Sequence, residues 1–98
     1  MKSVVVHHFW NPTCGPCKAV KPALNMLAEE FADSVTWVSV NTHDDKQGYK
    51  DCYAVTAVPT IVVVVRDESG KDVHIEKHSG TSIAGYYRIV RNCIGSKS

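Results

Sequence analysis

Two cysteines separated by two residues are the clearest chemical feature of this sequence. Cys14 and Cys17 enclose Gly15 and Pro16, which shape the turn between them, and a helical pattern follows. A cysteine at the start of a helix faces unpaired backbone N–H groups and the positive end of the helix dipole, which stabilise a thiolate. Cys17 lies one turn further along and within reach of the first sulfur. This spacing predicts thiol–disulfide exchange, with Cys14 as the attacking thiol and Cys17 as the resolving thiol.

The other two cysteines, Cys52 and Cys93, have no such partner in the sequence. Cys93 falls beside the apolar stripe of the last predicted helix and is interpreted as a small buried hydrophobic residue. Cys52 has a more open context and is a candidate reactive thiol. A zinc site at Cys14 and Cys17 is a competing hypothesis, but structural zinc commonly uses two such pairs, and no second pair exists. We therefore expect no metal.

The length and charge of the chain narrow the class of protein. Ninety-eight residues have room for one domain, residues 1–98. Eleven Lys and Arg against ten Asp and Glu give a formal charge of +1, which argues against a nucleic-acid binder because such proteins need a concentrated basic face. The longest aliphatic run, residues 61–65, is far shorter than the roughly 20 residues that cross a bilayer. We expect a cytoplasmic monomer that binds neither nucleic acid nor membrane.

The hydropathy pattern predicts the elements that must position the cysteine pair. The predicted strands cover residues 3–9, 35–41, 60–66 and 71–78, and the predicted helices cover residues 15–32, 44–54 and 82–94. The first strand is apolar on both faces, as in a strand covered by helices on each side. A helix joins the first two strands, so these strands should be parallel with a right-handed crossover. The prediction is an α/β fold with a mixed four-stranded sheet flanked by three helices.

The last predicted strand separates apolar from polar residues. Val73 and Ile75 share one face, whereas the other face carries Asp72, His74, Glu76 and His78. We interpret the polar face as solvated, including both histidines, and the strand as a sheet edge. The final helix is expected to bury a face that comprises Ile83, Tyr86 or Tyr87, Val90 and Ile94.

Several motifs resemble the thioredoxin family, over residues 4–94. They are Phe9-Trp10, Cys14-Gly15-Pro16-Cys17-Lys18, Pro22 and Ala57-Val58-Pro59-Thr60. The resemblance implies a thioredoxin-like fold in which Pro59 is a cis-proline packed against the cysteines and Val58 offers its backbone to an extended substrate. The peptide bond before a proline is the only kind that adopts the cis form at low cost. Gly80 matches the family glycine that lets substrate approach. The expected substrate-binding set is Trp10, Thr13, Val58, Pro59, Thr60 and Gly80.

This chain departs from the family pattern at several positions. Only thirteen residues precede the first cysteine, so the usual first strand and helix are not expected, and the strand at residues 35–41 would form an unpaired edge. Thr13 replaces the usual tryptophan before the first cysteine. His8 aligns with the buried acid that assists the resolving cysteine, and Ser39 aligns with its lysine neighbour. Because imidazole can accept a proton at neutral pH, His8 is a candidate catalytic base, and the alternative is a silent core histidine.

The combined prediction is a thiol–disulfide oxidoreductase that reduces protein disulfides through Cys14 and Cys17. Its partners would be disulfide-containing proteins and a thioredoxin-reductase-type electron donor. The chain itself is expected to bind no cofactor, because no glycine-rich dinucleotide loop follows a strand. Two alternatives stay open. The same couple could act as an oxidase or isomerase, or the chain could be a redox-silent binding subunit of a larger complex.

Overall fold

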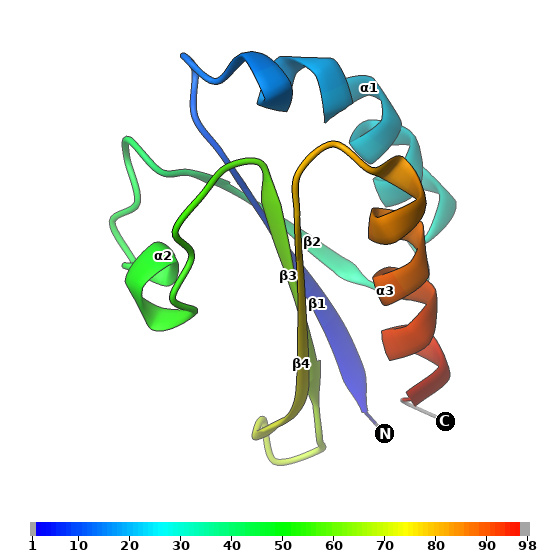
Figure 1. Cartoon of the computed structure of the whole chain (residues 1–98). Coiled ribbons are helices and arrows are strands. Elements are labelled where there is room, and N and C mark those ends of the chain that lie inside the picture. The colour runs from blue at the N-terminus through cyan, green and yellow to red at the C-terminus, as the bar shows by residue number, and fades with distance from the viewer. Residues whose placement is uncertain (1, 97–98) are drawn as a thin grey trace.

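The computed structural model describes residues 2–96 and shows a sheet with helices on both faces (Figure 1). In chain order the elements are β1 (Ser3–Trp10), α1 (Gly15–Glu30), β2 (Thr36–Asn41), α2 (Tyr49–Cys52), β3 (Thr60–Arg66), β4 (Asp72–Ser79) and α3 (Ile83–Ser96). Helices α1 and α3 cover one face of the sheet, and α2 lies on the other. The predicted α/β class is confirmed.

Strand β1 lies inside the sheet, whose strand order is β2-β1-β3-β4. It pairs in parallel with β2 and antiparallel with β3, and β4 is antiparallel to β3. Helix α1 forms the crossover that the parallel pair requires. Strands β2 and β4 are therefore the two edges of a mixed sheet, as the sequence predicted.

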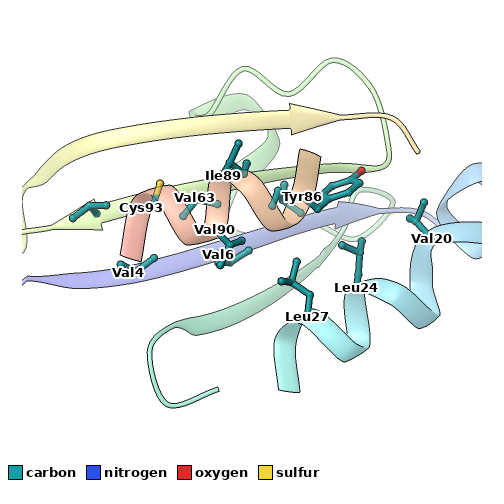
Figure 2. Packing of buried hydrophobic residues seen from close by; sticks show 12 residues of the cluster. Val4, Val6, Val20, Leu24, Leu27, Val63, Tyr86, Ile89, Val90 and Cys93 are labelled. Carbon is teal, nitrogen blue, oxygen red and sulfur yellow. The ribbon is translucent and has the colours of Figure 1, made fainter. Parts of the chain in front are cut away.

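The central strands bury side chains on both faces, because successive residues of a strand point to opposite sides. Under α1 and α3 the buried cluster comprises Val4, Val6, Val20, Leu24, Leu27, Ile61, Val63, Val65, Tyr86, Ile89, Val90 and Cys93 (Figure 2). On the opposite face a smaller cluster comprises Phe9, Val40, Tyr53, Val55, Val62 and Val64. Cys93 is completely buried, as expected, and Cys52 is exposed.

Helix α2 is much shorter than the predicted helix over residues 44–54, because only Tyr49–Cys52 is helical. Gly48 precedes it with a φ of 71°, a left-handed conformation that interrupts any helix arriving from the residues before it. The Asp45 carboxylate accepts hydrogen bonds from the backbone N–H groups of the first two helical residues, at 3.0 and 2.8 Å. These hydrogen bonds favour a turn followed by one short helix over a continuous helix.

The structure reverses the predicted faces of β4. Val73 and Ile75 are 46% and 45% exposed, whereas the polar face turns toward α3. The His78 ring packs edge-on against Tyr86 with centroids 4.6 Å apart, and a Cβ at Gly85 would collide with this imidazole. The glycine thus lets α3 approach a polar surface. The interpretation of this face as solvated holds for Asp72 and His74, which are exposed, but was wrong for Glu76 and His78, which are half-buried. Strand alternation shows which residues share a face but not which face a helix covers.

The buried leucine Leu27 and its exposed neighbour Met26 test the packing of α1. Leu27 has no exposed surface, so Leu27→Ala should lower the free energy of unfolding by about 2–5 kcal/mol. Met26 is 65% exposed, and Met26→Ala should change it by less than about 0.5 kcal/mol. Urea unfolding of the two variants measures both effects. Equal losses would contradict the orientation of α1.

Candidate functional site

Cys14 ends the loop after β1 and caps helix α1. Its backbone is extended (φ −85°, ψ 108°), and its sulfur accepts a hydrogen bond from the backbone N–H of Cys17 at 3.0 Å. Pro16 lies in the first turn, where its missing N–H costs nothing. The sulfur therefore occupies the positive end of a 16-residue helix. This environment favours the thiolate form of a reduced Cys14.

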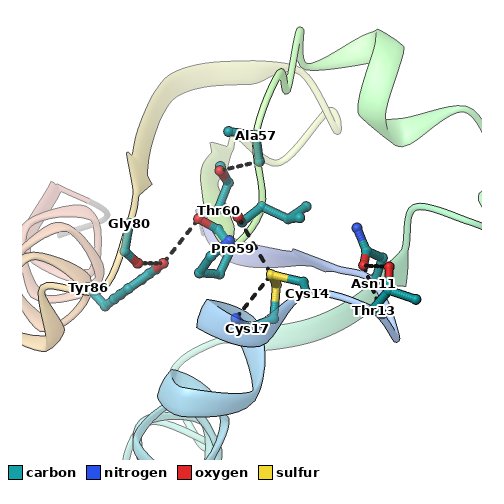
Figure 3. Close-up of a disulfide and its surroundings, with 10 residues drawn as sticks. Asn11, Thr13, Cys14, Cys17, Ala57, Pro59, Thr60, Gly80 and Tyr86 are labelled. Atoms are coloured by element: carbon teal, nitrogen blue, oxygen red, sulfur yellow. Dashed lines mark hydrogen bonds between the residues drawn. A yellow bond between two sulfur atoms is a disulfide. The ribbon is translucent and has the colours of Figure 1, made fainter.

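Cys14 and Cys17 form a disulfide, with their Cα atoms 5.2 Å apart (Figure 3). Cys17 is 5% exposed, whereas Cys14 is half-buried and Gly15 is exposed. A protein that approaches this pair meets the Cys14 sulfur first. The difference in burial supports Cys14 as the attacking thiol and Cys17 as the resolving one.

The loop before β3 lies against the disulfide (Figure 3). The Val58–Pro59 peptide bond is cis, as the resemblance implied. Val58 and Cys14 are 44 positions apart in the sequence, yet the Val58 carbonyl oxygen lies 3.7 Å from Cys14 Sγ. Pro59 is buried and Val58 is half-buried, so the accessible backbone beside the cysteine belongs to Val58.

A hydrogen-bond network holds this loop from behind. The Tyr86 hydroxyl donates to the Gly80 carbonyl oxygen at 2.6 Å and lies 3.3 Å from that of Pro59. The Gly80 N–H also donates to the Pro59 carbonyl oxygen, at 3.1 Å. Gly80 has a φ of 103°, a conformation that favours glycine. Burial raises the pKa of Tyr86 to about 12, so its hydroxyl stays protonated and continues to donate at any physiological pH.

The Thr60 side chain supports the loop. It is 2% exposed, and its hydroxyl lies 2.7 Å from the Ala57 carbonyl oxygen and 2.6 Å from Ser79 Oγ. A substrate-binding role for Thr60 stays a prediction, and the buried side chain favours support of the loop over direct contact. Sequence reasoning missed the roles of Ser79 and Tyr86. The signal in the sequence for the second of these was the tyrosine itself. Tyr86 falls on an apolar helix face, where a phenylalanine would pack without a hydroxyl group that needs a partner.

Trp10 and Thr13 lie on the other side of the cysteine pair. Trp10 Nε1 donates to Ser39 Oγ at 2.7 Å, which joins the end of β1 to β2. The backbone N–H and the hydroxyl of Thr13 both donate to Asn11 Oδ1, at 3.0 Å. Trp10 is half-buried and Thr13 is exposed, so a docked protein can touch both.

A cavity of about 610 Å³ adjoins the buried cysteine. Its lining includes Cys17, His8, Trp37 and Ser39, and the last of these is the register partner of His8 in the parallel β1–β2 pair. His8 is 8% exposed, and its Nε2 has no hydrogen-bond partner among residues 2–96. A cavity of this size has room for water that can bridge polar atoms. The fold thus places His8 and Cys17 on one shared cavity.

His8 is a weaker base than the sequence-based hypothesis assumed. Burial, with a smaller contribution from the positive charge of Lys21, lowers its pKa from 6.5 to about 4. The ring is therefore neutral at pH 7 and can accept a hydrogen bond or a proton. His7 points to the opposite face, where its ring lies 5.0 and 4.9 Å from those of Tyr49 and Tyr53, and burial lowers its pKa as well.

The part of the chain that the structure describes gathers no metal-binding cluster at the disulfide. Within residues 2–96, no group of three or more His, Cys, Asp and Glu side chains at metal-binding distance includes Cys14 or Cys17. A structural zinc ion needs four ligands. The described residues do not supply the other two at this pair.

The known proteins that resemble this chain are thioredoxins by name. The thioredoxin family model matches residues 1–86. A chloroplastic M-type thioredoxin of Brassica napus is 38% identical over 80 residues, which are 82% of this chain and 44% of that protein. Thioredoxin of Haemophilus influenzae is 43% identical over 56 residues, which are 57% of this chain and 51% of that protein. The X-ray structure of Fasciola hepatica thioredoxin has a TM-score of 0.69 at 27% identity, over 98% of this chain and 82% of that one. The chain spans about half the length of the curated relatives it matches.

The buried imidazole of His8 should make the fold sensitive to acid. An unfolded chain binds a proton at His8 below about pH 6.5, whereas the folded chain holds the pKa near 4, so stability falls as the pH drops through this window. In a His8→Gln variant the loss of unfolding free energy between pH 7 and pH 5 should be smaller by about 1–2 kcal/mol. Urea unfolding at both pH values measures it, and the contribution of His7 cancels because both proteins contain it. Identical pH dependence in the two proteins would refute this role.

Proposed function

The chain belongs to the thioredoxin family, and from that premise we propose that it is an oxidoreductase that reduces protein disulfides through Cys14 and Cys17. The observation that carries the proposal is the disulfide at the N-terminus of α1, which lies against the cis-Pro59 loop. We also propose that residues 1–98 form one domain and that the chain acts as a monomer.

The reaction transfers two electrons from the reduced pair to a substrate disulfide. The Cys14 thiolate attacks one substrate sulfur, which forms a mixed disulfide and releases the first substrate thiolate. Cys17 then loses its proton and attacks Cys14 Sγ, which forms the Cys14–Cys17 bond and releases the second substrate thiolate. Two electrons and two protons from a separate donor restore the dithiol. We assign that donor to the thioredoxin-reductase type, because the chain has no dinucleotide-binding loop of its own.

The accessible surface around Cys14 fits an extended segment of a substrate protein. The backbone of Val58 lies beside the sulfur, and a Cβ built at Gly80 would meet no atom within 4 Å, so this side is open. Trp10 and Thr13 bound the other side. Main-chain contacts along an exposed backbone recognise extended peptides with little dependence on their side chains. The substrate class we propose is therefore proteins whose disulfides lie in accessible, extended segments.

The direction of the reaction distinguishes this proposal from an oxidase or isomerase with the same cysteines. Titration of the couple against glutathione separates the two, because thioredoxins lie near about −270 mV and strong oxidants near about −120 mV. A redox-silent binding subunit is the remaining alternative. In that case a Cys14→Ser, Cys17→Ser double variant would keep the full function of the chain.

The compartment is part of the proposal. Among residues 2–96 no helix combines the length and the apolar character that crossing a bilayer requires. The relatives named above include a chloroplastic and a bacterial thioredoxin. The cytoplasmic location expected from the sequence stays a prediction.

The two cysteines should behave differently when each is replaced singly. In Cys17→Ser the first step proceeds and the second cannot, so covalent adducts between Cys14 and substrate proteins should accumulate. In Cys14→Ser the buried Cys17 should trap few or none. Non-reducing gels of both variants after incubation with a disulfide-containing protein measure the difference. Equal trapping by the two variants would reject the assigned roles.

We further propose that His8 takes up the proton of Cys17 in the second step. Burial of Cys17 disfavours its thiolate, and the neutral His8 on the same cavity is a base that carries no buried charge at rest. The matched control is His7, which adjoins His8 in the sequence but faces the opposite side of the sheet.

His8→Ala should slow the resolution of a preformed mixed disulfide at pH 7 by about tenfold or more, a modest value for general base catalysis because the base is weak. His7→Ala should leave the rate within about twofold. The difference should shrink as the pH rises, since hydroxide then deprotonates Cys17 directly. Rapid-mixing measurements of product release from pH 6 to 9 give the profiles. An unchanged profile in His8→Ala would leave His8 as a packing residue only.

A further inference from the structure

Three side chains with metal-binding atoms meet where β4 packs against α3. His74 and Glu76 come from the strand and Cys93 comes from the helix, and their ligand atoms all lie within 4.8 Å of one another. His74 Nε2 is 3.1 Å from Glu76 Oε2, and Cys93 Sγ is 3.2 Å from the same oxygen. The redox reaction uses none of these residues, and the sequence interpretation set aside His74 as solvated and Cys93 as hydrophobic.

The fold brings these three atoms together through rigid elements. Residues two apart in a strand share a face, so His74 and Glu76 both project from β4 on the side that α3 covers. Their register against Val65 and Val63 of the central strand β3 fixes this position. Cys93 has no exposed surface, and Figure 2 shows its sulfur on the side of α3 that faces β4. The cluster therefore does not depend on a loop.

We propose that His74, Glu76 and Cys93 form a zinc site. Zinc bonds of about 2.0–2.1 Å to nitrogen, 2.0–2.2 Å to oxygen and 2.3 Å to sulfur set the edges of a tetrahedron at about 3.4 Å for N···O and 3.6 Å for S···O. The observed separations of 3.1 and 3.2 Å are slightly shorter, and the His74 nitrogen and Cys93 sulfur lie within 4.8 Å of each other. The side chains must therefore adjust their positions to surround the ion. Three protein ligands leave the fourth position for a water molecule on the exposed side, where His74 lies.

The charge and hydrogen bonding of Glu76 suit a metal ligand. Glu76 Oε2 lies within hydrogen-bond distance of His74 Nε2, Asn92 Nδ2 and Cys93 Sγ. A carboxylate held in this way offers zinc a negatively charged oxygen ligand. Asn92 Nδ2 donates to Glu76 Oε2 at 2.8 Å, and such a neighbour orients a ligand without binding the metal itself.

The thiol of Cys93 must exchange its proton for the metal. Burial together with the neighbouring Glu76 raises its pKa to about 12, so without metal the thiol is protonated and donates to the carboxylate. On binding, the S–H bond breaks, the Zn–S bond forms, and the proton leaves to water with no change of oxidation state. The mixture of imidazole, carboxylate and thiolate suits zinc, whereas calcium and magnesium prefer oxygen ligands alone.

The direct test is titration of the oxidised protein with Zn²⁺ by calorimetry, because the Cys14–Cys17 disulfide then offers no competing thiolates. We expect one zinc ion per chain and a loss of affinity of at least about tenfold in His74→Ala. His74 is largely exposed, so this variant should fold. The matched control is His43→Ala, since His43 is also exposed and lies outside the cluster. Absence of saturable binding, or equal affinity in His74→Ala and the unchanged protein, would overturn the proposal.

Cobalt identifies the sulfur ligand. Co²⁺ in the zinc site should give a thiolate-to-metal charge-transfer band, and this band should persist in Cys52→Ser, which removes the exposed thiol. With the other two cysteines in the disulfide, persistence assigns the band to Cys93 even if a Cys93→Val variant fails to fold. Loss of the band in Cys52→Ser, or no band in the unchanged protein, would overturn the assignment.

A ligand that joins β4 to α3 only in the folded chain should also raise the melting temperature. At zinc concentrations about tenfold above the dissociation constant we expect a rise of about 5–10 °C. The rise should be absent in Glu76→Gln, which keeps the shape of the side chain and removes its charge. An equal rise in Glu76→Gln would place the bound zinc elsewhere.

Discussion

Strand β1 is hydrogen-bonded along both edges, and the arrangement of the site depends on this. Its partners are β2 in parallel and β3 antiparallel, so neither edge faces water and its side chains must fit into the layers above and below the sheet. Alternation along the strand then sends His7 to the α2 face and His8 to the α1 face. The strand ends where the loop to α1 begins, and that loop delivers Cys14 to the helix N-terminus. One strand therefore fixes the positions of the imidazole and the attacking sulfur together.

Helix α3 supports the other half of the site. Near its start, Tyr86 bonds to Gly80 and contacts Pro59, which holds the cis-proline loop against the disulfide. Near its end, Cys93 contacts Glu76 of β4. In both places a polar side chain of α3 contacts polar atoms of the sheet or its loops, on a surface that strand alternation would predict to be exposed to solvent. Buried polar atoms need partners, and here the partners lie on the neighbouring element, so the polar atoms join α3 to the sheet and do not weaken the packing.

The sequence predicts best what depends on local pattern, and less well what depends on how layers meet. The valine-rich β1 and β3, helix α1 and the role of Cys14 follow from hydropathy, spacing and the helix dipole. The faces of β4 do not follow from these signals. The apolar Val73 and Ile75 suggest that theirs is the buried face, but α3, which Gly85 allows to approach, packs on the other face and leaves them exposed. The supporting role of Thr60 is equally hidden. A threonine beside a proline motif suggests an accessible side chain. In the structure the register of β3 against β4 pairs Thr60 with Ser79, and their hydroxyl groups form a hydrogen bond.

The histidine at position 8 gives the cavity an electrostatic behaviour that differs from that of a buried carboxylic acid. A buried carboxyl group resists ionisation, so it destabilises a fold as the pH rises, whereas a buried imidazole resists protonation and destabilises a fold as the pH falls. With its pKa near 4, the His8 ring itself stays uncharged throughout the neutral range. The charged side chains that line the cavity beside Cys17 are those of Lys18, Lys21 and Glu29. In the proposed step the proton of Cys17 passes to the neutral His8 ring, which creates a thiolate and an imidazolium that attract each other across the cavity they share. Because burial disfavours both charged forms, this attraction and the water for which the cavity has room must offset the cost of desolvation. The low pKa of His8 therefore makes it a weak base, and its proposed contribution depends on its place in the same cavity as Cys17.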